Sequence, residues 1–256
     1  MSTMHAVDIA RLSGTAVAVE VVAETGSTNA DLLARAATLE HNLLLVALSQ
    51  TAGRGRAGRS WLSGAGSLTF SLAWKFHLPL HALAGLPLAV GVALAETLAS
   101  LDVRVQLKWP NDVLKDGAKL AGVLIETQSA PDGGLWTVIG VGMNLALPDE
   151  LEQAIGRPAA SAPWLASMER AALMAALLER LAASLAQFEQ QGFAAFSARW
   201  NRLHAWQGRP VAIVDHGATL HEGVAAGVDD SGALLLDTAG GRIAIVAGDV
   251  SLRERA

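Results

Sequence analysis

The sequence predicts a protein of the α/β (α+β) class, in which a larger mixed α/β domain is followed by a small all-β module. Segments of strand length alternate with helical stripes through the first 207 residues. The composition shifts at QGRP, residues 207–210, and short alternating segments follow to the end of the chain. A chain of 256 residues can form one large domain or two unequal ones. We therefore expect domains at 1–207 and 208–256.

The first strand and helix are expected between residues 16 and 37. Residues 16–22, AVAVEVV, alternate in the manner of a strand, and Gly26 marks the turn after it. Thr28, with Asp31 three residues later, forms a capping pair for the helix that follows. The apolar stripe of that helix consists of Leu32, Leu33, Ala36 and Ala37.

Strands at 42–48 and 68–76 flank a loop rich in glycine and arginine, GRGRAGRSW at 53–61. Its spacing fits a dinucleotide fingerprint and falls one residue short of a P-loop. Both motifs need a helix after the loop, but residues 68–76 alternate with a period of two and predict a strand. The dinucleotide motif also needs an acidic residue further on, and none lies between Trp61 and Lys75.

Both fingerprints are therefore rejected, and the loop is interpreted as a site for one small anion. Glycine leaves backbone N–H groups approachable, and guanidinium groups suit a phosphate or a carboxylate. Such a loop could also fold over a ligand and exclude water. The alternative is a solvated basic turn.

Further helices and strands are expected up to residue 203. A helix runs from about Pro87 to Leu101, and a strand at 103–108 leads into a turn at Asn111-Asp112. Two strands, 119–128 and 135–145, are joined by the turn SAPDGG. Two helices follow, with stripes formed by Leu173, Leu177, Leu181, Leu185 and Phe188, and by Phe193, Phe196, Trp200 and Leu203.

The C-terminal part is expected to form a small barrel of about five strands. VAIV, HEGVAAGV, ALLLD and RIAIVA are short alternating segments within residues 211–247. The turn sequences DDSG and TAGG separate them.

Composition and charge exclude several classes of protein. A formal net charge of −5 argues against a general nucleic-acid binder. The absence of cysteine excludes disulfides and thiolate metal sites and fits a reducing cytosol. The longest apolar region, residues 82–95, is too short to span a bilayer and is interpreted as a core helix. Because the N-terminus also lacks the apolar core of a signal peptide, we expect a cytoplasmic protein with no membrane span.

The histidines form no metal site. His77 and His81 have the i, i+4 spacing of zinc ligands, but no third ligand lies near them and Pro79 breaks any helix between them. With no cysteine and no G-x-S-x-G motif, the chain also offers no nucleophile for covalent catalysis.

Five polar clusters are expected at strand ends or turns, where a sheet presents a site. They are residues 27–29, Gln50 with the 53–61 loop, 108–112, 119–122 and 140–144. A structural role competes with ligand binding in most of them. These roles are a helix cap for Thr28, a turn for Asn111 and Asp112, solvation for Lys119, a core anchor for Trp61 and a strand cap for Asn144.

Five of these motifs together resemble the biotin protein ligases, also called biotin–[acetyl-CoA-carboxylase] ligases. The motifs are ETGSTN, SQTAGRGRAGRSW, LKWPNDV, KLAGVLIE and GVGMNL, in this order, and the resemblance covers roughly residues 20–253. It implies a mixed-sheet catalytic domain of the biotin/lipoate ligase type, followed by a small SH3-like β barrel. It also implies a two-step reaction. Biotin and MgATP give biotinyl-5′-AMP and pyrophosphate, and the acyl group then passes to one lysine of a biotin carboxyl carrier domain of acetyl-CoA carboxylase.

The resemblance also implies roles for individual residues. The biotin-binding set is Ser27, Thr28, Asn29, Gln50, Arg54, Gly55, Arg56, Lys119 and Gly122. The nucleotide-binding set is Arg56, Arg59, Trp61, Asn111, Lys119 and Asn144. The catalytic set is Lys119, Arg56 and Asp112, in which Asp112 would orient or deprotonate the incoming carrier lysine. Mg²⁺ would be carried by the pyrophosphate oxygens, with no metal site in the protein itself.

These roles agree with the charge requirements of the reaction. Activation brings the carboxylate of biotin against the α-phosphate, and the two negative groups repel each other unless cations and N–H groups surround them. The arginine loop and Lys119 supply such groups.

The sequence departs from parts of the family in two places. Some members carry an N-terminal helix-turn-helix of about 60 residues, and the stretch before TGSTN is too short for that unit. We therefore expect a monofunctional ligase that does not bind DNA. Ala57 also stands where relatives often have a basic residue, which leaves the consequence for loop closure open. Whether the protein forms a homodimer is left open too.

Two alternative functions remain at this point. A lipoate or octanoate ligase would share the fold and the adenylate chemistry, although GRGRAGRSW favours biotin. A biotin-sensing protein without catalysis would share the binding residues, and the arginine loop and Lys119 argue against it.

Overall fold

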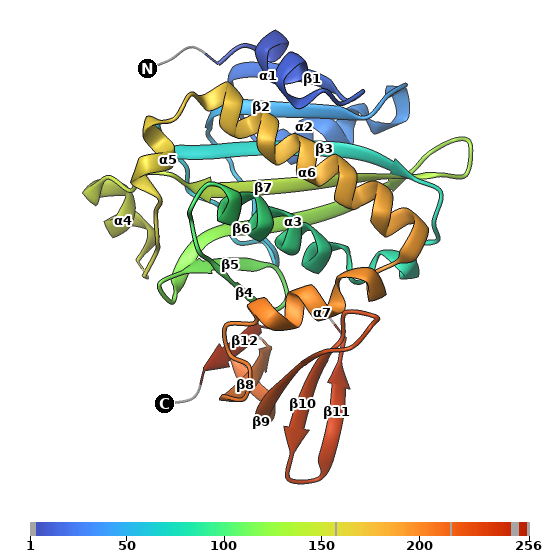
Figure 1. The fold of residues 1–256 in the computed structure, drawn as a ribbon, viewed down its shortest axis with the longest axis vertical. Helices are drawn as coiled ribbons and strands as arrows, with labels where there is room; N and C mark the ends of the chain where they lie inside the picture. The colour runs from blue at the N-terminus through green and yellow to red at the C-terminus, as the bar shows by residue number, and fades with distance from the viewer. Residues whose placement is uncertain (1–3, 157, 216, 247–250, 255–256) are drawn as a thin grey trace.

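The computed structural model describes residues 4–156, 158–215, 217–246 and 251–254, and it confirms the α/β class. A seven-stranded sheet carries helices on both faces, and a five-stranded sheet lies at the C-terminal end of the chain (Figure 1). We call them the large sheet and the small sheet.

The large sheet is mixed, as predicted. Its strand order is β1-β2-β3-β7-β6-β5-β4. β1 and β2 are parallel, and every other neighbouring pair is antiparallel. The strands are β1 (Ala18–Thr25), β2 (Leu43–Gln50), β3 (Ser67–Phe76), β4 (Gln106–Lys108), β5 (Asp112–Lys115), β6 (Ala118–Ser129) and β7 (Leu135–Asn144).

The two faces of the large sheet are covered unequally. On β2, Leu44 and Val46 point into the main core, whereas Leu43 and Leu45 join a smaller cluster with Leu32 of α2. Both faces of this strand are therefore buried, which explains its continuous apolar run. The main core is closed by α1 (Ala6–Ser13), α3 (Leu86–Ser100), α6 (Arg170–Gln191) and α7 (Ala194–Leu203). The opposite face is covered by α2 (Thr28–Arg35), which contacts β2, β3, β6 and β7.

Two helical segments are long and apolar enough to cross a membrane, namely residues 80–100 and 170–191. The first is longer than the 14-residue apolar region of the sequence because a 3-10 turn, η2 (Leu80–Leu83), precedes α3. Their most apolar windows are 72 % and 56 % buried inside the protein, and α3 packs against α6. Both segments are thus accounted for as helices of the core, as the sequence predicts for the first of them.

The structure corrects the predicted start of α2 and adds short elements. Ser27, and not Thr28, is the N-cap, because its hydroxyl oxygen accepts from the N–H of Ala30 at 3.5 Å. Asp31 accepts instead from the hydroxyl of Thr25 at 2.5 Å. The predicted strand at 103–108 is confined to β4, and the turn before Asp112 leads directly into β5. The predicted helix that included Ala36 and Ala37 ends as α2 at Arg35, and a 3-10 turn, η1 (Ala36–Thr38), follows it. Elements without a sequence prediction include α1, η2, α4 (Asp149–Ile155), α5 (Pro163–Ser167) and β5.

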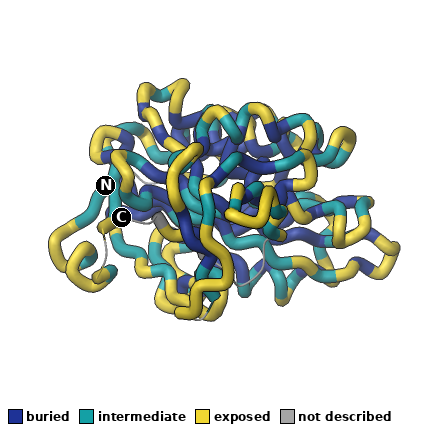
Figure 2. Tube along the Cα trace, turned by 90° about the horizontal axis from the view of Figure 1, so that it is seen from below, coloured by how far each residue is buried: buried dark blue, intermediate teal, exposed yellow. Residues whose placement is uncertain are grey.

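The small sheet contains the five strands expected from the sequence. Its order is β11-β10-β9-β8-β12, and all of its pairings are antiparallel. The strands are β8 (Pro210–Asp215), β9 (Ala218–Val228), β10 (Leu234–Thr238), β11 (Gly241–Ile245) and β12 (Ser251–Glu254). In the molecule as a whole, Figure 2 shows buried segments gathered inside and exposed segments on the outside, and the exposed residues include the first part of β9. The division of the chain at 207/208 stays a prediction.

Three side-chain contacts tie the small sheet to the rest of the molecule. The indole N–H of Trp109 donates to the carbonyl of Gly232 at 3.2 Å, and the hydroxyl of Ser197 donates to Asp230 at 2.6 Å. The amide of Asn201 exchanges two hydrogen bonds with the backbone of Val228, at 3.0 and 2.8 Å. Because Trp109 lies within the predicted cluster 108–112, two residues before Asn111, the small sheet is connected to that site.

Candidate active site

A cleft of about 940 Å³ opens on the α2 side of the large sheet, and we call it the main cleft. Its floor is formed by the facing strands β6 and β7, where Gly122 lies opposite Gly142 and Leu124 opposite Gly140. A methyl group at Gly140 would collide with the side chain of Asn29, and one at Gly142 with the indole of Trp61. The glycines therefore leave space for the side chains that line the cleft.

The arginine-rich loop is a short hairpin, residues 53–61, that lies over this cleft. Its two arms are joined by the N–H of Gly55 to the carbonyl of Arg59 at 2.6 Å and by the N–H of Trp61 to the carbonyl of Gly53 at 2.9 Å. At the tip, Ala57 and Gly58 both have positive φ, 53° and 67°, as in a type I′ turn. The hydrogen-bonded arms and the tight turn at the tip together fix the positions of the arginines in the hairpin.

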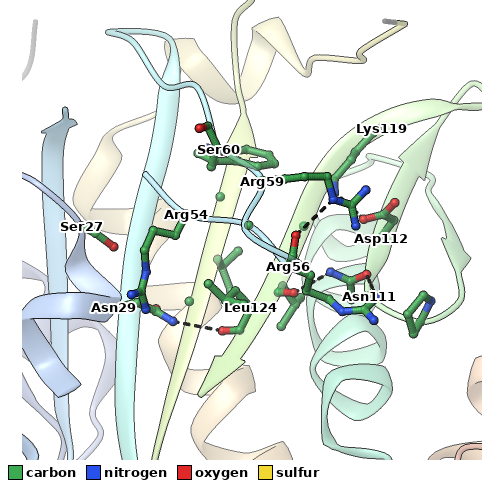
Figure 3. A pocket seen from close by; sticks show the side chains of 18 of the residues that line it. Ser27, Asn29, Arg54, Arg56, Arg59, Ser60, Asn111, Asp112, Lys119 and Leu124 are labelled. Carbon is green, nitrogen blue, oxygen red and sulfur yellow. Dashed lines mark hydrogen bonds and ion pairs between the residues drawn. The ribbon is translucent and has the colours of Figure 1, made fainter. Parts of the chain in front are cut away.

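The three arginines of the hairpin reach different parts of the cleft (Figure 3). Arg54 forms an ion pair with Glu126 of β6. Arg56 donates to Oδ1 of Asn111 at 3.1 Å, and Nε of Arg59 donates to the carbonyl of Arg56 at 3.1 Å.

The wall beneath α2 is a continuous chain of polar groups. The N–H and hydroxyl of Thr28 both approach Oε1 of Gln50, at 2.8 and 3.2 Å. The hydroxyls of Thr28 and Ser71 lie 2.7 Å apart, and Ser71 donates to Oδ1 of Asn29 at 2.5 Å. Asn29 in turn donates from Nδ2 to Glu126 at 2.9 Å. Thr28, Asn29 and Ser71 are buried, so this chain fixes which atoms of the wall face the cleft.

The opposite wall carries the charged groups. Nζ of Lys119 lies 2.5 Å from Oδ1 of Asp112 and 5.6 Å from the centre of the Trp61 ring. Both charged side chains are about four-fifths buried, with exposures of 22 % and 19 %. Asn111 is held by Val123, to whose carbonyl its Nδ2 donates at 2.7 Å. The arrangement brings a cation, a carboxylate and an amide to one edge of the cleft.

A second hollow of about 760 Å³, which we call the side pocket, lies next to the main cleft. Arg59, Ser60, Trp61 and Lys119 line both spaces. The side pocket also contains Asn144, which is 3 % exposed and donates to the carbonyl of Ala160 at 3.3 Å. Oδ1 of Asn144 and the indole N–H of Trp61 are buried and have no hydrogen-bond partner among the described residues. Their hydrogen-bonding capacity is therefore not used by the described residues.

The structure brings the residues of the sequence prediction together. All of them line the main cleft except Asn144, which lines the side pocket. The predicted role of Thr28 as the cap of α2 is not observed, because its hydroxyl contacts Gln50 and Ser71. The roles of the individual residues in binding and catalysis stay predictions. No group of three or more histidine or acidic residues that could hold a metal ion occurs among the described residues.

Three residues of the site were missed. Glu126 follows Leu124 on the cleft face of β6, and an acid within an apolar strand was the available signal. Ser71 is a small polar residue on the buried β3, where alternation alone predicts only a strand. Arg253 lines the cleft from β12 of the small sheet, and nothing in the local sequence indicates this approach.

Comparisons with known proteins agree with this arrangement. The model of the Biotin/lipoate A/B protein ligase family matches residues 19–144, and that of the Biotin protein ligase C terminal domain matches residues 208–253. The chain is 35 % identical over 253 residues to the bifunctional ligase/repressor BirA of Escherichia coli K12, covering 96 % of this chain and 76 % of that protein. It is 36 % identical over 243 residues to biotin–[acetyl-CoA-carboxylase] ligase of Mycobacterium tuberculosis, covering 90 % and 87 %.

The fold is also similar to that of a solved structure. The biotin protein ligase from Aquifex aeolicus in complex with biotin and ATP matches with a TM-score of 0.77 and 28 % identity, over 93 % of this chain and 99 % of that one. This similarity extends over both sheets, and the sequence similarity to the Mycobacterium protein extends over nine-tenths of the chain. The chain therefore belongs to the biotin protein ligase family.

Proposed function

We propose that this protein is an ATP-dependent biotin ligase that acts in two steps. In the first, a carboxylate oxygen of biotin attacks the α-phosphorus of ATP, pyrophosphate leaves, and biotinyl-5′-AMP is formed. In the second, the amine of a carrier lysine attacks the acyl carbon, an amide bond forms, and AMP leaves. The carrier is a biotin carboxyl carrier domain of acetyl-CoA carboxylase, the substrate that the names of the relatives from Mycobacterium tuberculosis and Paracoccus denitrificans indicate.

The observation that carries this proposal is the position of Lys119 and the hairpin where the main cleft meets the side pocket. A carboxylate and a phosphate repel each other, and they react only where cations and N–H groups neutralise both. Lys119 and Arg59 line both spaces, and Arg56 lies beside them in the main cleft. A ligand that spans the two spaces would therefore place its acyl-phosphate group beside these cations.

The polar wall suits the ring system of biotin. A cyclic urea has two N–H donors and one carbonyl acceptor, so it needs acceptors and donors fixed in a buried place. Ser27, Thr28, Asn29 and Gln50 supply both kinds of group, and Arg54, Gly55 and Gly122 complete that end of the cleft. We assign the ring system to this wall and the carboxylate to Arg56 and Lys119.

The side pocket suits the nucleotide. Its walls include Trp61, Asn144 and Arg59, and the indole N–H of Trp61 and Oδ1 of Asn144 have no hydrogen-bond partner among the described residues. An adenine needs a flat apolar surface and a few polar contacts at its edge. Mg²⁺ is assigned to the phosphate oxygens of ATP, in line with its preference for phosphate and water ligands.

Asp112 is our candidate for the second step. A lysine amine attacks only when it is neutral, and a carboxylate at the edge of the cleft can orient it and accept its proton. In the protein alone Asp112 is paired with Lys119. The carboxylate would therefore serve both steps, first by fixing Lys119 and then by receiving the carrier amine.

The test is to incubate the protein with biotin and MgATP in the absence of carrier and to detect biotinyl-5′-AMP by mass spectrometry. We expect the wild type to form it, and Lys119→Ala and Arg56→Ala to be strongly impaired. Biotin binding without adenylate formation would instead identify a biotin-sensing protein. Adenylate formed from lipoate or octanoate in preference to biotin would identify a ligase of the related class.

The remaining expectations concern partners and location. The net charge of −5 supports a protein that does not bind DNA, and DNA affinity that falls steeply with salt would contradict it. Self-association is open to test by sedimentation, with and without biotin and ATP. The absence of cysteine supports a location in the cytoplasm.

A further inference from the structure

We propose that Glu126 is a positioning residue that holds the hairpin 53–61 over the main cleft and orients Asn29. The inference rests on the proposed function for its consequence in the reaction, although the contacts themselves do not depend on it. Glu126 belongs to none of the clusters by which the sequence predicted the site. It would keep biotinyl-5′-AMP enclosed until the carrier arrives.

The geometry of Glu126 is that of a shared acceptor. Its Oε2 accepts from the guanidinium of Arg54 and, at 2.9 Å, from Nδ2 of Asn29. These donors come from the hairpin and from α2, whereas Glu126 stands on β6. One carboxylate oxygen therefore joins the lid of the cleft to its wall and to its floor.

The orientation of Asn29 follows from this contact. Ser71 donates to Oδ1 of Asn29, so the other end of the amide must be Nδ2, which donates to the carboxylate. Asn29 is 3 % exposed, and its amide lies against Gly140, where no side chain would fit. Nδ2 of Asn29 also donates to the carbonyl of Leu124 at 3.4 Å, so Glu126 and this carbonyl together fix which edge of the Asn29 amide faces the rest of the wall.

The hold on the hairpin is electrostatic and moderate in strength. The side chains of Arg54 and Glu126 are 41 % and 30 % exposed, and pairs with that degree of exposure contribute little on their own. Hydrogen bonding to the buried Asn29 keeps the carboxylate in one place, which reduces the entropy that Arg54 loses in meeting it. A contact of this strength can close the hairpin and still allow it to open for substrate entry.

Closure matters for the intermediate of the proposed reaction. Biotinyl-5′-AMP is a mixed anhydride, which water hydrolyses and which escapes when the lid opens. The ion pair with Glu126 gives Arg54 a part in holding the lid, whereas Arg56 and Lys119 are the cations that we assign to the acyl-phosphate group. Weakening the Glu126 contact should therefore release adenylate without abolishing its formation.

The test compares Glu126→Gln with wild type and with a matched control. Glutamine keeps the volume and an acceptor oxygen for Asn29 but removes the charge that Arg54 contacts. The control is Glu96→Gln, which removes the charge from a pair with Arg199 at 3.1 Å between α3 and α7, where the glutamate is 28 % exposed. Thermal unfolding of the three proteins shows whether each variant is folded.

The first readout is limited digestion with trypsin, which cuts after arginines in the hairpin and requires no catalysis. We expect Glu126→Gln to be cut there about two- to fivefold faster than wild type, the range of a partly exposed ion pair. Glu96→Gln should be cut at the wild-type rate. Equal rates of cutting for Glu126→Gln and wild type would overturn the proposal, whether or not the protein is a ligase.

The second readout is the share of biotinyl-5′-AMP that passes an ultrafiltration membrane. Glu126→Gln should release a larger share of the adenylate that it forms than the wild type does. In an Arg54→Ala background the same substitution should add no further release, because the contact is already absent. Release that rises equally in both backgrounds would show that Glu126 does not act through Arg54. A wild type that forms no adenylate would contradict the ligase function. The rates of tryptic digestion would then be the remaining test of the contact between Glu126 and Arg54.

Discussion

Ala57 adopts a backbone conformation that suits asparagine or glycine better than alanine. Its φ of 53° lies in the left-handed region, which costs residues with an ordinary Cβ about 1 kcal/mol. Asn-Gly is the preferred pair at the tip of a type I′ hairpin, and Gly58 already follows. The sequence left open how Ala57 affects closure of the loop, and the structure relates this question to the geometry of the turn.

We expect Ala57→Asn to stabilise the hairpin by somewhat less than about 1 kcal/mol. Hydrogen exchange at the N–H groups of Gly55 and Trp61 should slow, because both groups join the arms of the hairpin. Ala52→Asn serves as the control, since that residue precedes the hairpin and has no positive φ. Unchanged exchange in Ala57→Asn would mean that the tip does not limit the opening of the hairpin.

A substitution at Gly142 tests whether the floor of the cleft needs a residue without a side chain. In Gly142→Ala the new methyl group would meet the indole of Trp61, and the ring would have to leave the boundary between the main cleft and the side pocket. We expect adenylate formation to fall by at least about tenfold, the effect of displacing a positioning group by about 1 Å. Gly64→Ala is the control, because its nearest neighbour would lie 3.9 Å away. Wild-type activity in Gly142→Ala would show that adenylate formation does not depend on the position of the Trp61 indole.

At the scale of single residues, the sequence predicted most of the cleft lining because short motifs carry the polar groups. It misplaced the cap of α2, since Thr28 is engaged by Gln50 and Ser71, which belong to other strands. It missed Glu126 for the same reason. An acid within the apolar β6 was a local signal, but only the tertiary fold shows that its partner is Arg54, 72 residues earlier in the chain.

At the scale of elements, the turn that joins β9 and β10 supports the segment between β4 and β5. Trp109 is fully buried, and its indole N–H donates to Gly232 in that turn. The next residues along the chain are Pro110, Asn111 and Asp112, which line the main cleft. The small sheet therefore contributes to the placement of Asn111 and Asp112 through Trp109.

We expect Trp109→Phe to lower the free energy of unfolding by about 1–3 kcal/mol, because the carbonyl of Gly232 loses its buried donor. Adenylate formation should also fall. Ser197→Ala is the comparison, since it removes the contact of the same turn with α7 and leaves Trp109 in place. If both variants lose stability but only Trp109→Phe loses activity, the turn supports the site through Trp109. Equal losses of activity in both variants would contradict this role of Trp109.

The strands and long helices were predicted well because their patterns are strong. The alternation of β3 and the apolar run of β2 have no helical competitor, and α6 and α7 carry clear stripes. β5 was missed because four residues between two turns carry too little pattern. The parallel pairing of β1 with β2 was not predicted either, since pairing depends on the connection through α2 and not on either strand alone.

At the scale of the whole molecule, His204 lies where the two sheets meet. It is 5 % exposed, packs on Trp200 with ring centres 4.7 Å apart and forms a parallel bridge with Leu107 of the large sheet. Burial lowers the pKa of His204 below its usual value of 6.5, and a contact with Gln207 offsets part of this effect. The neutral ring is thus the form that the folded protein favours.

The sign of the pH dependence follows from this lowered pKa. Below about pH 6.5 the unfolded chain binds a proton at this histidine that the folded protein does not bind, so stability is complete above that pH and falls as the pH decreases. Urea unfolding between pH 7.5 and 5.5 should show this loss. The slope should be smaller in His204→Gln and unchanged in His221→Gln, whose histidine is exposed on β9. A slope that survives in His204→Gln would assign the effect to other groups.

The overall division into a mixed sheet and a small β module was predictable because composition changes sharply near residue 208. The meeting of the two parts at the cleft was not. Arg253 reaches the main cleft from β12, and Trp109 reaches into the small sheet, across separations of more than 100 residues in each case. Contacts of this kind depend on how complete helices and strands pack against one another. The periodicity of a local sequence segment does not specify that packing.

The position of Arg253 has a practical consequence for anyone who wishes to attach a label to this protein. A purification tag or fluorescent protein fused after residue 256 would begin four residues beyond a side chain that lines the main cleft. Such a fusion would lie close to the main cleft. The other end is safer, since α1 packs against α6 on the face of the large sheet opposite the cleft, and a label placed there would leave the approach to the lysine acceptor clear.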